Sequence, residues 1–349
     1  MSSAAARLES PTLMFREAAE APSVVRAQLD ANLPIAGGLA DRLRHSPPRA
    51  VLTLGRGSSD HAATYARYLM ETRLGVITAS VPPSISSVYD AAPTMDGTLC
   101  LAISQSGRSP DLLTAAHAAA EAGALVVALV NDETSPLARS AEAVLPLRAG
   151  PETSVAATKS FIASLSAILQ LTALWSGDDD LVRQLGGLAD LLDSAWRLDW
   201  SAALEPLSRA QSLYVLGRGI GLGIAEEAAL KLKETCGLHA EAFSAAELRH
   251  GPMALVGPGF PVLAFAQSDG TLKGVEATAR QCAAQGAPVF LAGGHPGDGV
   301  DHLPAPKAHP ALQTIAEAQS FYRFAEQLAR RRGLDPDRPP HLSKVTETV

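Results

Sequence analysis

Residues 219–252 carry the side-chain types that proton transfer on a sugar requires. Lys231 and Glu234 are three positions apart, which places both on one face of a helix. His250 precedes a Gly-Pro pair, where a helix is expected to end. A carboxylate base, a histidine and a lysine together can open a sugar ring and move a proton between its first two carbons. The spacing alone fits an exposed, salt-bridged helix face with a polar cap equally well.

A second polar group follows the buried-strand pattern at 99–103. The loop 104–109 contains three serines and a glycine, and Pro110 then opens a helix. Hydroxyls, a glycine that permits close backbone approach and helix amides form an anion site, and a phosphate can use all of these donors. Ligands of open parallel sheets lie beyond the carboxyl ends of the strands, where Ser58 and Ser59 also follow a strand. We therefore expect the two loops to flank one phosphate, with a simple capped turn as the alternative.

The chain contains an internal duplication. The segment 51–57, a buried-strand pattern that runs into a glycine turn, returns 162 positions later at 213–219. This spacing is far longer than a solenoid repeat, so it indicates duplication of a domain. In the second copy the loop equivalent to 104–109 begins at Gln267 and contains Asp269, which would repel a phosphate. The phosphate is therefore expected in the first copy.

Within each copy, short β-rich runs alternate with alanine-rich helical stretches, which predicts an α/β fold with a doubly wound parallel sheet flanked by helices. Proline-rich sequence after residue 333 disfavours helix, so an extended tail is expected there. The predicted divisions are a helical arm (1–46), a phosphate-binding domain (47–175), a helical linker (176–209), a second domain with the acid-base residues (210–332) and a tail (333–349).

Composition restricts the class of protein. The 349 residues carry a net charge of −7 and no basic stripe, which argues against nucleic acid as a partner. No apolar run is long enough to suggest a membrane span, and three distant cysteines suggest neither disulfides nor a zinc site. A cytoplasmic protein is expected. The dinucleotide and P-loop glycine motifs are both missing from the sequence.

Several motifs together resemble a known family. They are Ser104-Gln-Ser-Gly107, Ala149-Gly-Pro-Glu-Thr-Ser-Val-Ala-Ala-Thr-Lys159, Ala229-Leu-Lys-Leu-Lys-Glu234, Ala246-Glu-Leu-Arg-His-Gly-Pro252 and His341-Leu-Ser-Lys344. With these motifs the chain looks like the isomerase half of glucosamine-6-phosphate synthase, over nearly its whole length. The resemblance implies two tandem sugar-isomerase (SIS) domains. It also implies that the sugar phosphate is held by Ser58, Ser59, Ser104, Gln105, Ser106 and Ser109, with Val155 nearby.

The same resemblance implies roles for the remaining site residues. Glu234 would be the proton-transfer base, and Lys231 would orient or polarise the sugar. His250 would assist ring opening from the other subunit of a homodimer. Lys344 would be the amine that forms a Schiff base with the open ketose, while its tail closes over the site. The resemblance implies no metal and no organic cofactor.

Our prediction of the direction of the reaction rests on two differences between this sequence and that of the synthase. The synthase begins with a glutaminase domain whose nucleophilic cysteine follows the initiator methionine, whereas Ser2 follows Met1 here. The loop 55–61 is similar to that of SIS-type glucosamine-6-phosphate deaminases. We therefore expect glucosamine 6-phosphate to be converted to fructose 6-phosphate and ammonia in amino-sugar catabolism. The alternatives are a fructosamine-6-phosphate deglycase, a synthase-like isomerase without a glutaminase, and a non-catalytic sugar-phosphate sensor.

Overall fold

The computed structural model describes residues 11–91 and 93–344. The chain divides into two compact units. The N-terminal unit comprises Ser23–Pro151 and Ser160–Ala189. The C-terminal unit comprises the described residues up to Pro22, the segment Glu152–Lys159 and Asp190–Lys344. The segment 152–159 therefore belongs to the later unit although the family resemblance places it among residues of the first domain.

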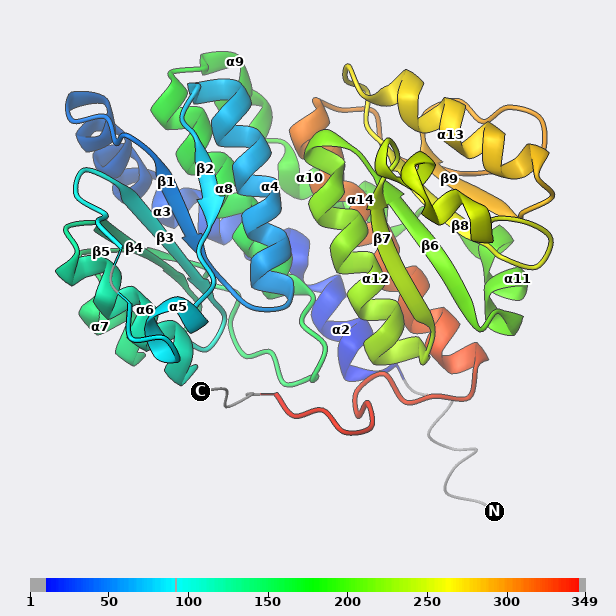
Figure 1. The fold of residues 1–349 in the computed structure, drawn as a ribbon, viewed down its shortest axis with the longest axis horizontal. Helices are drawn as coiled ribbons and strands as arrows, with labels where there is room; N and C mark the ends of the chain where they lie inside the picture. Colours follow the sequence, from blue (N-terminus) through cyan, green and yellow to red (C-terminus); the bar gives the residue numbers. More distant parts are fainter. Residues whose placement is uncertain (1–10, 92, 345–349) are drawn as a thin grey trace. The chain divides into compact units, whose positions relative to one another are not determined.

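The N-terminal unit is built on a five-stranded parallel sheet (Figure 1). Its strand order is β2-β1-β3-β4-β5. The strands are β1 (Val51–Leu54), β2 (Thr78–Ser80), β3 (Leu99–Ser104), β4 (Leu125–Val130) and β5 (Ala143–Pro146). All six residues of β3 are buried, as expected for a central strand covered on both faces.

The C-terminal unit repeats this architecture with the order β10-β9-β8-β6-β7, which is the same topology when read from the other edge. Its strands are β6 (Ser212–Gly217), β7 (His239–Ser244), β8 (Val262–Ala266), β9 (Val289–Gly293) and β10 (Val300–Leu303). All pairings are parallel. The predicted α/β fold with two duplicated parallel sheets is thereby confirmed. In both sheets the strand order reverses beside the first strand, at β1/β3 and at β6/β8, and ligands of such sheets bind at this switch point.

Helices cover the sheets. Those lying mainly in the N-terminal unit are α3 (Ala21–His45), α4 (Ser58–Leu74), α5 (Ser84–Ser87), α6 (Pro110–Glu121), α7 (Pro136–Ser140), α8 (Lys159–Ser176) and α9 (Asp179–Leu185). Those of the C-terminal unit are α2 (Leu13–Ala19), α10 (Leu188–Trp196), α11 (Leu204–Arg209), α12 (Leu222–Cys236), α13 (Leu272–Ala284) and α14 (Pro310–Arg331), with 3-10 turns η1 (Ser201–Ala203), η2 (Gly219–Gly221), η3 (Glu247–His250) and η4 (Pro252–Leu255). In Figure 1, α12 accompanies β6 and β7, while α13 packs on β8 and β9.

The second copy differs from the sequence expectation around His250. The segment after α12 forms the edge strand β7 and then the turn η3. His250 therefore ends a short 3-10 turn, whereas the sequence predicted the end of a helix. The tail is described as far as Lys344, and residues 345–349 lie outside the described residues. The three cysteines are buried and form no disulfide. Within the described part of the chain, no helix has the length and apolar character needed to cross a membrane.

Candidate active site

The serine loop, residues 104–109, joins β3 to α6 at the carboxyl edge of the N-terminal sheet. Gly107 adopts φ +61°, and a Cβ at this position would lie 2.3 Å from Ser135 Oγ. Only glycine avoids both the backbone strain and the collision. The hydroxyl of Ser104 accepts a hydrogen bond from the Gly107 amide at 3.0 Å. The loop is therefore held in one tight conformation.

The chain following β4 supports this loop. The carbonyls of Gln105 and Gly107 accept hydrogen bonds from Asn131 N and Leu137 N, both at 3.2 Å. Among residues 11–91 and 93–344, no acceptor is found for the amides of Ser106, Arg108 and Ser109. Ser109 is the N-cap residue of α6, in extended conformation, and its side chain makes no capping bond. Backbone donors and hydroxyls at this helix start are thus available to an anion.

An ion pair connects the serine loop to the loop that follows β1. Arg56 donates from Nε and Nη2 to Asp111 Oδ2 at 3.0 and 2.8 Å, and the Asp111 side chain is fully buried. Ser58 and Ser59 begin α4 immediately after this arginine, and β1 pairs directly with β3. The strands that carry the two serine groups are therefore neighbours. The joint role of their hydroxyls in phosphate binding stays a prediction, and Arg56 was missed.

The predicted acid-base residues lie on α12. Lys231 Nζ donates to Glu234 Oε2 at 2.6 Å and contacts Glu227 Oε1 at 3.4 Å. The Lys231 side chain is only 1% exposed. Burial lowers the pKa of Lys231, but the carboxylates of Glu227 and Glu234 outweigh it, so the pKa is raised overall. An exposed, salt-bridged helix face is thus ruled out for Lys231 and Glu227, because these charges are buried against the protein.

The tail lysine reaches the segment 152–159 within the same unit. Lys344 Nζ donates to the carbonyl of Ser154 at 2.7 Å and to Glu152 Oε2 at 3.4 Å. Glu17 of α2 holds this segment in place by accepting from Thr153 N at 2.6 Å and from Ser154 N at 3.1 Å. Val155, which follows, is half-buried. The structure therefore brings Lys344 and the Val155 segment together.

His250 is exposed and lies apart from Glu234 in this chain. The helix α12 packs on β7, and the chain reverses between them at Gly237, which has φ +58°. Glu234 is thus near the start of β7, whereas His250 follows its end. Six extended residues span about 20 Å. One chain therefore does not place His250 beside Glu234.

The switch point of the second sheet is filled by the protein itself. Gln267 Nε2 donates to Glu317 Oε2 at 2.6 Å, and Gln313 Nε2 donates to Glu317 Oε1 at 2.9 Å. A Cβ on Gly221 would lie 2.0 Å from Gln267 Oε1, so the Gln267 side chain occupies the space beside β6. Asp269, whose charge is expected to repel a phosphate, accepts a hydrogen bond from Thr271 N at 2.7 Å. Glu317 and Gln313 come from the distant α14, and no local motif in the sequence revealed them.

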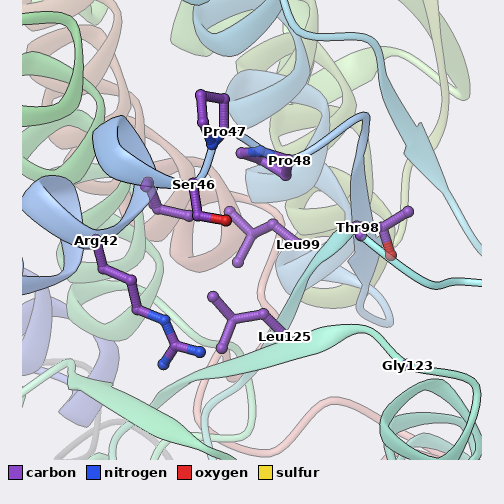
Figure 2. Close-up of a pocket in the computed structure, with 10 residues that line it drawn as sticks. Arg42, Ser46, Pro47, Pro48, Thr98, Leu99, Gly123 and Leu125 are labelled. Atoms are coloured by element: carbon purple, nitrogen blue, oxygen red, sulfur yellow. The ribbon is translucent and has the colours of Figure 1, made fainter.

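Among the described residues, one hollow lies beside the end of α12 and another lies at the edge of the N-terminal sheet. A cavity of about 550 Å³ lies between the end of α12 and the tail, and is lined by Glu234, Lys233, Leu334, Arg338 and Leu342 among others. A smaller one of about 130 Å³ lies at the amino edge of the N-terminal sheet, where Leu99 and Leu125 begin neighbouring strands beneath Ser46 (Figure 2). This second hollow is at the edge opposite the serine loop.

Comparisons with known proteins agree with this architecture. The SIS-domain profile matches residues 46–174 and 206–302, and the chain belongs to the SIS-domain family. The glutamine–fructose-6-phosphate aminotransferase of Aeropyrum pernix is 37% identical over 317 residues, covering 84% of this chain and 50% of the relative. That of Sulfolobus acidocaldarius is 33% identical, covering 96% of this chain and 56% of the relative. The chain thus spans about half the length of these relatives.

Solved structures show the same fold. A Silicibacter pomeroyi protein assigned as a phosphosugar isomerase is 44% identical with a TM-score of 0.90, covering 94% of this chain and 100% of the other. The C-terminal domain of the Francisella tularensis glucosamine-fructose-6-phosphate aminotransferase is 26% identical with a TM-score of 0.86, covering 95% and 99%. A Thermotoga maritima glucosamine-6-phosphate deaminase is 22% identical with a TM-score of 0.78, covering 97% and 100%, and shows the fold alone.

Proposed function

We propose that this protein is a phosphosugar isomerase that converts glucosamine 6-phosphate and water to fructose 6-phosphate and ammonia. The proposal is carried by the contact at 2.6 Å between the buried Lys231 and the partly exposed Glu234, because a carboxylate that is held by a fixed cation and still open to a ligand is suited to proton transfer on carbon. The serine loop and the names of the relatives support a sugar phosphate as the substrate. The enzyme acts in the cytoplasm as a homodimer in amino-sugar catabolism.

Each step has a proposed residue. The serine loop and Ser58 and Ser59 bind the phosphate, and His250 of the partner copy helps to open the ring. Glu234 takes the proton from C2 of the open aldose and returns it to C1, while the ammonium group on C2 gives one proton to O1, which leaves a hydroxyl at C1 and an iminium group at C2. Water adds to this iminium carbon, and ammonia leaves as the ketone of fructose 6-phosphate forms. Lys231 stabilises the charge at the reacting oxygen, while Lys344 can form a Schiff base with the open ketose.

Purified protein incubated with glucosamine 6-phosphate is expected to release ammonia and fructose 6-phosphate in equal amounts. Glu234→Gln removes the base and should abolish turnover while sugar-phosphate binding is kept. Glu241→Gln, which changes an exposed carboxylate on β7, is the matched control and should retain turnover. Unchanged turnover in Glu234→Gln would remove Glu234 from its role, and no ammonia from the wild-type protein would refute deamination.

A fructosamine-6-phosphate deglycase is the second candidate, and the cavity beside Glu234 favours it. The cavity has a volume of about 550 Å³ and extends from Glu234 along the tail to Leu342, which offers space for a substituent on the amine. Lys233 and Arg338 could meet the carboxylate of an amino acid attached to the sugar. Turnover of a fructosamine 6-phosphate without turnover of glucosamine 6-phosphate would select this reaction.

A further inference from the structure

Tyr322 of α14 is fully buried beside the acid-base residues of α12. Its hydroxyl donates a hydrogen bond to Glu227 Oε1 at 2.9 Å. The same Glu227 oxygen lies 3.4 Å from Lys231 Nζ, and Lys231 in turn donates to Glu234 at 2.6 Å. A continuous chain of polar contacts thus leads from the phenol to the proposed base. Neither Tyr322 nor Glu227 was among the residues to which the sequence assigned a role.

The charged groups that act on Tyr322 come from two elements. Glu227 and Glu234 belong to α12, and Glu152 belongs to the segment that also binds Lys344. Burial raises the pKa of Tyr322 well above its usual value, and these three carboxylates raise it further. The phenol therefore stays protonated and remains a donor. The cations near these carboxylates include Lys231, Lys344 and Lys233, whose charge interacts with Glu234.

The proton chemistry of Glu234 makes Glu227 important. When Glu234 takes a proton from the sugar it loses its charge, and Glu227 is then the carboxylate that balances the buried Lys231 ammonium. An unpaired ammonium in such a place would be strongly disfavoured. A hydrogen bond to a carboxylate stabilises its ionised form, so the Tyr322 hydroxyl favours an ionised Glu227 throughout the cycle.

We propose that Tyr322 is a positioning residue for proton transfer: by donating to Glu227 it keeps Lys231 shared between Glu227 and Glu234. This role rests on the proposed function of Glu234 as the base. Without the hydroxyl, Glu227 competes more strongly for Lys231 and for protons. Glu234 then loses part of the contact with Lys231 that stabilises its charge.

The test is the exchange of deuterium from D₂O into C1 of fructose 6-phosphate, followed by NMR, which reports proton transfer without requiring ammonia release. Tyr322→Phe keeps the ring and removes the hydroxyl. Its exchange rate at saturation should fall about tenfold or more while KM changes by less than about threefold. The acid limb of its rate-pH profile should move to higher pH. If Tyr322→Phe folds poorly, Glu227→Gln is the second variant. It removes the charge between Tyr322 and Lys231 and should also lower the exchange rate.

Tyr65→Phe is the matched control, because Tyr65 is a second fully buried tyrosine but lies in α4 of the N-terminal unit. It should leave both the exchange rate and the acid limb unchanged. Tyr322→Phe with a wild-type rate and profile would overturn the proposal, as would equal effects in the two tyrosine variants. No exchange by the wild-type protein would overturn the site assignment and this role together. Exchange without ammonia release would refute only the proposed deamination.

Discussion

Glu317 at the second switch point gives the C-terminal unit a distinctive dependence on pH. Its carboxyl group is fully buried, and burial raises its pKa to about 8, against the opposing effect of hydrogen bonds from Gln267 and Gln313. The unfolded chain releases this proton near pH 4.5. Between these values the folded state holds one more proton than the unfolded state, so the free energy of unfolding decreases by about 1.4 kcal/mol per pH unit as pH rises.

In the variant Glu317→Gln residue 317 cannot ionise, so the part of the pH dependence of the free energy of unfolding that comes from Glu317 should disappear. Because the titration is half complete at the folded pKa, the wild-type protein should lose about 2 kcal/mol between pH 6 and 8 that the variant keeps. Urea unfolding can be followed by tryptophan fluorescence in a Trp175→Phe background, which leaves only Trp196 and Trp200, both in the C-terminal unit. The comparison is made at pH 6, 7 and 8.

The informative measurement is the difference in the free energy of unfolding between the wild-type protein and Glu317→Gln at each pH. Glu247→Gln, a change at an exposed carboxylate of the same unit, should follow the wild-type curve and serves as the control. If Glu317→Gln and the wild-type protein lose stability in parallel from pH 6 to 8, Glu317 does not hold a proton in the folded state. The reasoning from its burial would then be refuted.

Three other variants test the geometry described above. Gly107→Ala should cost about 1 to 3 kcal/mol and weaken binding of a sugar phosphate by calorimetry, because it combines φ +61° with a collision at Ser135; wild-type affinity would contradict this. Lys231→Met should lower stability by about 3 to 5 kcal/mol in chemical denaturation, since it leaves Glu227 without its cation. Asp337→Ala should cost about 1 kcal/mol and speed trypsin cleavage of the tail, because Asp337 accepts from Leu13 N and Met14 N, both at 2.7 Å; an unchanged cleavage rate would exclude this anchoring.

The central strands could be predicted from sequence because their residues are continuously apolar. The run at 125–130 is such a case, and it forms β4 over the same bounds. The edge strands β2, β7 and β10 are harder to predict, since an edge strand meets polar surroundings on one side and its sequence is mixed. In β7, His239 and Glu241 are exposed while Ala240 is buried. Such a short alternation is hard to distinguish from a loop.

The candidate site was only partly accessible from sequence. Local motifs identified the serine loop, and the three-residue spacing predicted that Lys231 and Glu234 share a helix face. The burial of Lys231 was not predictable, because it depends on α14, whose contact with α12 joins residues 95 positions apart. Tyr322 and Glu317 both come from α14. Their importance follows from tertiary packing and from no pattern within the helix itself.

The carboxyl group of Glu317 can also be described as a ligand that is covalently attached to its own binding site. A side chain that cannot diffuse away has an effective concentration far above that of any dissolved metabolite. Gln267 and Gln313 hold it from both sides, and the missing Cβ atoms of Gly221 and Gly293 leave room for these side chains only. Duplication thus produced two equivalent switch points, and the protein's own side chains occupy one of them.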